Sequence, residues 1–363
     1  MRLTRRSFLS CASCAVLGSG LLGCAGSRQR AGNALPINTL RKPIRPPRGQ
    51  VLFIAGQGGD HIGEYLDHMP VRPGGFTVYC SVASGWGIGD PVCDRPELKD
   101  SVLHLSVGWV DDSPLSPGSN NRAITTGAFD ANIERLAQWC AGQPRPILLR
   151  IGYEFDRGVP IPHYHYDPAY FAHGFRRMVD RIRAAGARNV ATVLASTNCP
   201  GFSPVLTTKK FNRFYPGDEY VDWLGCSMWM PQDVDQVILS EARKRGKPVL
   251  LAETTPVKYN IGQGTYWPHY IGLSHRVSAQ EIWDGWHQPM IDFLQANSDV
   301  IAAWHYIAED WSADAQWGGV FFFSHCDARP WANPEFAELW NRQINAAPFM
   351  QASPTLFHEL GYS

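Results

Sequence analysis

The sequence predicts an α/β fold of the (β/α)8 TIM-barrel type, in which eight parallel strands close into a cylinder and helices cover its outside. From residue 50 onward, short apolar runs typical of buried strands alternate with segments whose apolar residues recur at helical spacing. Eight strand candidates fit within the 363 residues, and such a barrel needs about 250. No Gly-x-Gly-x-x-Gly motif follows the first strand, so an open nucleotide-binding sheet is not favoured.

The strand candidates are mostly continuous apolar runs, which indicates strands buried on both faces. In chain order they span residues 51–55, 76–82, 102–109, 146–153, 190–195, 221–229, 248–252 and 300–306. Helical stripes span residues 129–140, ended by Gly142, and 171–182, ended by Gly186. Further stripes span residues 234–242 and 282–294, and residues 334–344 are expected to form the closing helix.

The overall composition excludes several classes of partner. Lysines and arginines number 33 and so do aspartates and glutamates, which gives no electrostatic reason to bind nucleic acid. The six cysteines from Cys80 to Cys326 lack the spacing of zinc ligands, so a cysteine-based metal site is not expected. No other cofactor is expected. His163, His165 and Asp167 could ligate a metal, but we expect no further histidines at strand ends to complete such a site.

The N-terminus resembles an export and lipidation signal. Arg5 and Arg6, followed by a Phe-Leu pair, resemble a twin-arginine signal, and Leu-Leu-Gly before Cys24 resembles a lipoprotein box. We therefore expect residues 1–23 to be removed and Cys24 to carry lipid on the periplasmic or outer-membrane side of the cell envelope. Residues 24–48 are predicted to be a flexible tether and residues 49–363 the barrel domain.

Two strand candidates end on a carboxylate, Glu154 and Glu253. A charge that closes a buried strand is costly unless it is paired or hydrated, and barrel active sites lie at the carboxyl ends of the strands. The two glutamates are 99 residues apart, or roughly three βα units of about 31 residues, which assigns them to strands four and seven. Two carboxylates that face each other across the carboxyl end of the barrel suit the hydrolysis of a glycosidic bond. The alternative is a structural ion pair at the strand ends.

Glutamates on strands four and seven resemble those of clan A glycoside hydrolases. Residues 150–156, Arg-Ile-Gly-Tyr-Glu-Phe-Asp, are most similar to glycoside hydrolase family 26, typically β-mannanases, although that family usually has histidine where this chain has Tyr153. The resemblance covers roughly residues 50–345. It implies retaining cleavage of a β-linked poly- or oligosaccharide of the mannan, xylan or glucan type, with Glu154 as acid/base and Glu253 as nucleophile.

Further side chains are candidates for binding the sugar. Arg150 lies two and four residues before Gly152 and Glu154, which would place all three on one strand face, and it could hold a carboxylate ionised. Trp304 resembles the clan A tryptophan beneath the reacting sugar. The full set of candidates is Arg150, Tyr153, Trp229, Trp304, His305, Trp109, Asp60 and His61.

Each of these candidates also has an ordinary structural interpretation: an interior salt bridge, core packing or loop hydrogen bonding. Glu309 and Asp310, after the last strand, are competing acids that could equally be solvated. For the whole chain, the second hypothesis is an envelope lipoprotein that binds a glycan on a barrel scaffold without cleaving it. Two carboxylates at strand ends argue against that hypothesis.

The predicted N-terminal signal can be tested by membrane fractionation. Cys24→Ala should release or mis-process the protein, because the lipid-bearing sulfur is lost. Replacing Arg5 and Arg6 with lysine should leave it in the cytoplasm. Unchanged fractionation of both variants would contradict the prediction.

Overall fold

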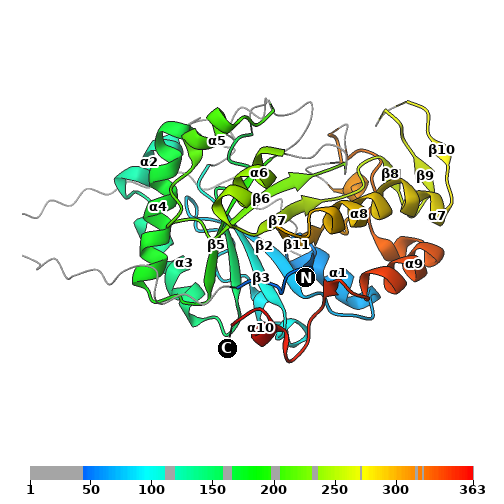
Figure 1. Cartoon of the computed structure of the whole chain (residues 1–363), viewed down its shortest axis with the longest axis horizontal. Helices are drawn as coiled ribbons and strands as arrows, with labels where there is room; N and C mark the ends of the chain where they lie inside the picture. Colours follow the sequence, from blue (N-terminus) through cyan, green and yellow to red (C-terminus); the bar gives the residue numbers. More distant parts are fainter. Residues whose placement is uncertain are drawn as a thin grey trace, which may run out of the picture. The chain divides into compact units, whose positions relative to one another are not determined.

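The computed structural model describes residues 44–110, 119–157, 166–197, 205–230, 236–269, 272–314, 318–320 and 323–362. They lie in one compact unit, Asn38–Ser363 (Figure 1). Cys24, the predicted signal, His163, His165 and Cys199 lie outside the described residues.

Eight parallel strands form a closed barrel, which confirms the predicted fold. They are β1 (Val51–Ala55), β2 (Gly75–Ser81), β3 (Val102–Gly108), β4 (Ile147–Ile151), β5 (Val190–Ser196), β6 (Trp223–Met228), β7 (Val249–Thr254) and β11 (Ile301–Tyr306). Each pairs with the next, and β11 pairs with β1 to close the cylinder. A short strand, β12 (Phe349–Met350), also pairs with β1.

Helices follow most of the strands and cover the barrel (Figure 1). They are α1 (Gly59–His68), α2 (Ser119–Thr126), α3 (Asp130–Gly142), α4 (Pro168–Ala184), α5 (Thr208–Phe214), α6 (Gln236–Arg245), α7 (Ala279–Ile282), α8 (Gln288–Ala296), α9 (Pro334–Ile344) and α10 (Leu356–Glu359). A π-helical turn, Trp283–His287, joins α7 to α8 within the predicted 282–294 helix. No helix in the described part of the chain is long and apolar enough to span a membrane.

Shorter elements occupy the connections between these helices and strands. A small antiparallel sheet of β8 (Tyr259–Asn260), β9 (Thr265–Tyr266) and β10 (His275–Arg276) follows β7. In the described part of the chain, 3-10 turns span Pro91–Asp94, Pro96–Leu98, Trp311–Ala313 and Pro330–Ala332.

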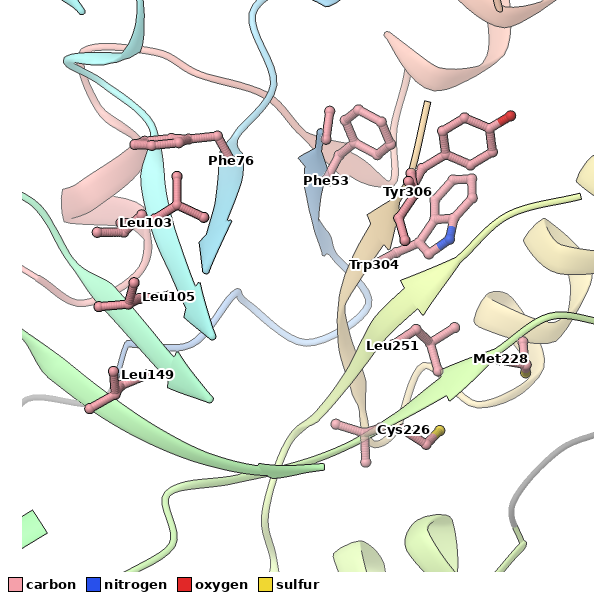
Figure 2. Packing of buried hydrophobic residues seen from close by; sticks show 14 of the residues in the cluster. Phe53, Phe76, Leu103, Leu105, Leu149, Cys226, Met228, Leu251, Trp304 and Tyr306 are labelled. Carbon is pink, nitrogen blue, oxygen red and sulfur yellow. The ribbon is translucent and has the colours of Figure 1, made fainter. Parts of the chain in front are cut away.

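The alternation of strand residues divides the core into two layers. Outward-facing side chains such as Phe53, Leu149 and Leu251 form one cluster with the surrounding helices (Figure 2). Inward-facing residues such as Leu148 and Leu250 form a second cluster inside the barrel. Polar side chains inside the barrel can therefore be recognised by their strand position.

The chain before β1 also packs against the barrel. Ile44 is buried in the inner cluster, and its carbonyl oxygen accepts a hydrogen bond of 3.1 Å from Trp223 Nε1. The Arg45 amide donates to the Leu360 carbonyl. Residues 24–48 were predicted to form a tether, but the packed domain already includes Ile44.

Candidate active site

Glu154 lies in a tight turn directly after β4. The strand ends at Ile151, and Gly152 and Glu154 have φ values of 60° and 53°. Among the described residues, Glu154 is the one non-glycine residue in the left-handed region, a conformation that costs about 1–3 kcal/mol and persists where surrounding contacts impose it. The prediction that Arg150, Gly152 and Glu154 alternate along one strand face is therefore wrong, because the chain turns before Glu154.

The packing beneath this turn requires glycine at position 152. A Cβ there would lie 2.5 Å from Phe171 Cε2 and 3.0 Å from Trp109 Cη2. The Trp109 and Phe171 rings pack with centroids 5.4 Å apart, and Trp109 has no exposed surface. Trp109 therefore supports the Glu154 turn from below, and the prediction that it contacts a sugar is wrong.

A β-bulge in β7 directs Glu253 toward the barrel interior. Cys226 pairs with Leu251, but the next pair is Ser227 with Glu253, so Ala252 is an extra residue. Leu251 faces the outer layer and Ala252 the inner one. Simple alternation would point Glu253 outward, and the bulge brings it back inside, as bulges near active sites often do.

Arg150 and Ser227 connect the two glutamates. Arg150 has no exposed surface, and its Nη1 donates a hydrogen bond to Glu253 Oε1. Arg150 Nη2 lies 3.5 Å from Ser227 Oγ, which donates to Glu154 Oε1 at 3.0 Å. Tyr79 on β2 donates from its hydroxyl to Glu253 Oε1 at 3.2 Å. The structure therefore brings together three predicted residues, Arg150, Glu154 and Glu253, from β4, the turn after it and β7.

The charges around this network affect Glu154 and Arg150 differently. Burial raises the pKa of Glu154; Arg157 opposes that rise, and the negative charge of Glu253 adds to it. Burial by itself would lower the pKa of Arg150, but the charges of Glu253 and its other acidic neighbours outweigh burial and raise it. Glu154 therefore retains a proton at pH values where an exposed glutamate has lost its own, whereas Arg150 stays a cation.

Three residues of the network, Tyr79, Ser227 and Arg157, are not among those predicted from the sequence. Arg157 Nη1 lies 3.1 Å from Glu154 Oε2. Tyr79 and Ser227 each lie near the carboxyl end of a buried strand, where their polar side chains reach the network. A polar residue late in an apolar strand was the sequence signal that could have identified these two.

Tyr153 lies beside the network, and its predicted contact with the sugar stays a prediction. The Arg150 guanidinium lies 5.4 Å from the centre of its ring, and the Tyr79 ring is 5.6 Å away in an edge-on arrangement. Tyr153 is half-buried, so part of the side chain remains accessible.

Trp304 lies on the outside of the barrel. A register shift between Ile301 and Ala303 makes Ala302 and Ala303 both face inward, and this reverses the direction of Trp304. Its ring has no exposed surface and packs edge-on against Phe53 (Figure 2). It also packs against the Trp340 and Phe349 rings. The prediction that Trp304 forms the floor beneath a sugar is wrong.

His305 points into the barrel but is fully enclosed. Its ring nitrogens contact the carbonyl oxygens of Ala252 and Gly56, and Thr77 Oγ1 lies 3.2 Å from Nε2. Burial lowers the pKa of His305 to about 4, although the two carbonyl contacts oppose this shift. Its role is structural, and the predicted sugar contact is wrong.

The remaining candidates surround the carboxyl end of the barrel. Trp229 follows β6, is nearly buried and packs edge-on against Phe323. Asp60 is exposed in the first turn of α1. His61 Nε2 lies 3.1 Å from Glu309 Oε1, so this competing glutamate is buried and paired rather than solvated.

A metal centre has no support within the described ranges. They contain no group of three or more histidine, cysteine, aspartate or glutamate residues that could hold an ion. The described cysteines, Cys80, Cys93, Cys140, Cys226 and Cys326, are all buried.

The Arg150–Glu253 pair predicts unequal effects of two similar substitutions on stability. Glu253→Gln leaves a fully buried arginine without its counterion and should lower the free energy of unfolding by about 3 kcal/mol. Glu154→Gln keeps the Ser227 hydrogen bond and removes a charge that burial disfavours, so its cost should stay below about 1 kcal/mol. Denaturant unfolding of both purified variants measures the difference, and equal losses would contradict it.

Known enzymes are similar to this chain in sequence. No family model matches it. A β-1,3-xylanase from a Vibrio species is 27% identical over 341 residues, which cover 91% of this chain and 72% of that protein. A β-1,3-xylanase from an Alcaligenes species is 27% identical over 328 residues, which cover 87% of this chain and 68% of the relative.

Solved structures share the fold at low sequence identity. An endo-β-1,4-mannanase from Cellulomonas fimi matches with a TM-score of 0.56 at 15% identity, over 85% of this chain and 73% of its own. The catalytic domain of an endo-β-1,4-mannanase from Bacillus sp. JAMB-750 matches with a TM-score of 0.56 at 15% identity, over 88% of this chain and 96% of its own. A family 26 β-mannanase from Bacteroides ovatus matches with a TM-score of 0.55 at 13% identity, over 84% of this chain and 91% of its own.

These matches agree with the motif at residues 150–156 and with the closed barrel, and they leave no need for the non-catalytic alternative. The chain is a glycoside hydrolase on a (β/α)8 barrel, similar in sequence to β-1,3-xylanases and in fold to family 26 β-mannanases.

Proposed function

We propose that this glycoside hydrolase cleaves β-1,3-linked xylan with retention of anomeric configuration, using Glu253 as nucleophile and Glu154 as acid/base. The observation that carries the proposal is the different surroundings of the two carboxylates. One is held at a single oxygen by a buried arginine and a tyrosine, and the other has a pKa raised by burial.

The contacts of Glu253 suit a nucleophile. Arg150 and Tyr79 both bind Oε1, and within the described part of the chain Oε2 accepts no hydrogen bond. Arg150 thus neutralises the charge and fixes the carboxylate plane, while Oε2 stays available to attack the anomeric carbon. A carboxylate that served only as a structural ion pair would gain by engaging both oxygens.

The surroundings of Glu154 suit a group that gives and takes a proton. Burial and the charge of Glu253 favour its protonated form, while Arg157 limits that effect. A general acid works best when its pKa lies near the operating pH. The left-handed backbone at Glu154 holds the carboxyl beside β6, where Ser227 Oγ binds Oε1.

The reaction then proceeds in two steps. Glu253 Oε2 forms a bond to the anomeric carbon as the glycosidic bond breaks, and Glu154 gives its proton to the departing oxygen. In the second step Glu154, now a carboxylate, removes a proton from water. The water oxygen attacks the anomeric carbon, and Glu253 leaves as a carboxylate. Two inversions at one carbon give net retention.

The choice of β-1,3-xylan rests on the two sequence relatives, each a β-1,3-xylanase that aligns over most of this chain. The mannanase structures are 13–15% identical and support the fold alone. Mannan, β-1,4-xylan and β-glucan are therefore the comparison substrates.

We also propose that the enzyme is exported by the twin-arginine route and anchored by lipid on Cys24. The support is the Arg5-Arg6 pair and the box that ends at Cys24. An anchored hydrolase would act on polysaccharide at the cell envelope, and the fractionation described above tests the location.

The stereochemistry of the product tests the mechanism. Proton NMR of the first products from β-1,3-xylan should show the β-anomer before mutarotation, with slower or no cleavage of the comparison polysaccharides. Glu154→Gln should lower turnover about 10²–10⁴-fold because proton transfer to the leaving group is lost. With an activated aryl xyloside, azide should rescue Glu154→Gly and give the β-glycosyl azide.

A matched control is Glu309→Gln, which removes another buried carboxylate from the carboxyl end of the barrel and should keep most of the turnover. A first-formed α-product from the wild-type enzyme would exclude Glu253 as the nucleophile. Rapid cleavage of mannan instead of xylan would replace the substrate and leave the mechanism intact.

A further inference from the structure

Arg157 contacts the proposed acid/base directly. It lies three residues after Glu154, and its Nη1 is 3.1 Å from Glu154 Oε2. The side chains are 19% and 8% exposed, so water only partly screens the pair. A charge-assisted contact of this kind stabilises the carboxylate form of a glutamate.

The two oxygens of Glu154 are engaged by different partners. Ser227 Oγ donates to Oε1 at 3.0 Å, and Arg157 contacts Oε2 at 3.1 Å. Glu253 differs, because Arg150 and Tyr79 both contact its Oε1. Arg157 therefore acts on the carboxyl that has to change its protonation state during the reaction.

We propose that Arg157 is a positioning residue that favours the carboxylate form of Glu154 between turnovers and so sets the upper pH limit of activity. This inference rests on the acid/base role proposed above for Glu154. A residue that acts first as an acid and then as a base needs both its protonated and its carboxylate form near the working pH. Burial favours the protonated form of Glu154, and Arg157 opposes that effect.

Several other charged or titratable groups face Glu154. Arg150 lies on β4 and Glu253 on β7, and the hydroxyls of Tyr79 on β2 and Tyr166 before α4 also interact with its charge. Arg150 is already paired with Glu253. Without Arg157, the nearby negative charge of Glu253 and burial would both raise the pKa of Glu154.

The turn that carries Glu154 has supports besides the Arg157 side chain. The Arg157 amide donates to the Glu154 carbonyl at 3.0 Å. Lys210 Nζ donates to the Asp156 carbonyl at 2.6 Å, and the Thr197 amide donates to Asp156 Oδ1 at 2.8 Å. A variant that changes only the Arg157 side chain should therefore fold.

The test compares three variants of the full-length enzyme. Arg157→Gln removes the charge, and Arg157→Lys keeps it. Arg243→Gln removes a different arginine, one paired with Asp299 on the surface. For each, the pH dependence of kcat/KM reports the acid/base groups of the free enzyme. A carbon NMR titration of labelled glutamate carboxyls measures the titration midpoint of Glu154 itself. The Glu154 signal is identified as the one that disappears in Glu154→Gln.

In Arg157→Gln, the NMR titration midpoint of Glu154 should move to higher pH by about one unit. The alkaline limb of the kcat/KM profile should move in the same direction by about the same amount. The sign follows because an acid with a raised pKa keeps its proton to higher pH. Arg157→Lys should restore most of the wild-type profile, and Arg243→Gln should leave it unchanged. A purely structural role for Arg157 would lower the rate at all pH values without moving the limb.

The two readouts separate this inference from the proposed function. An unchanged or lowered Glu154 midpoint in Arg157→Gln overturns the role of Arg157. If the NMR titration midpoint of Glu154 rises but the alkaline limb does not move, Arg157 does act on Glu154. That result nevertheless overturns both its control of the upper pH limit and the role of Glu154 as the acid.

Discussion

The buried contact between Arg150 and Glu253 is the interaction on which the site depends. Arg150 is fully enclosed within the barrel, where an unpaired guanidinium would cost about 3–5 kcal/mol. Its Nη1 atom pairs with Glu253 and fixes that carboxylate at the carboxyl end of β7. Its Nη2 atom lies near Ser227, whose hydroxyl donates to Glu154. One buried cation therefore connects Glu253, the proposed nucleophile, to Glu154, the proposed acid/base, and gives the two carboxylates different surroundings.

Two local departures from regular strand geometry make this arrangement available. The left-handed residues Gly152 and Glu154 turn the chain at the end of β4, over the Trp109 and Phe171 rings. The extra residue Ala252 in β7 re-aims Glu253 inward. Bulges and strained backbone concentrate at functional sites because the surrounding fold can impose them. The regular barrel supplies that support through its two core layers.

Much of this architecture could be predicted from the sequence, because buried strands and helical stripes have different apolar periods. The spacing of Glu154 and Glu253 also identified the strands that carry them. The directions in which the strand side chains point, into or out of the barrel, were harder to predict from the sequence. The register shift in β11 turns Trp304 outward and His305 inward, and no apolar pattern reveals such a shift. Partners from other strands, such as Tyr79 and Ser227, become neighbours only after the barrel closes.

The central claim is that Glu253, held by Arg150, forms a covalent bond to the sugar. An activated xylobioside that carries fluorine in place of its 2-hydroxyl slows both steps and allows the glycosyl-enzyme to accumulate. Mass spectrometry of the digested protein should then find one xylobiosyl ester, located on Glu253. A label on Glu154 or Glu309, or steady inactivation without any covalent adduct, would contradict the account.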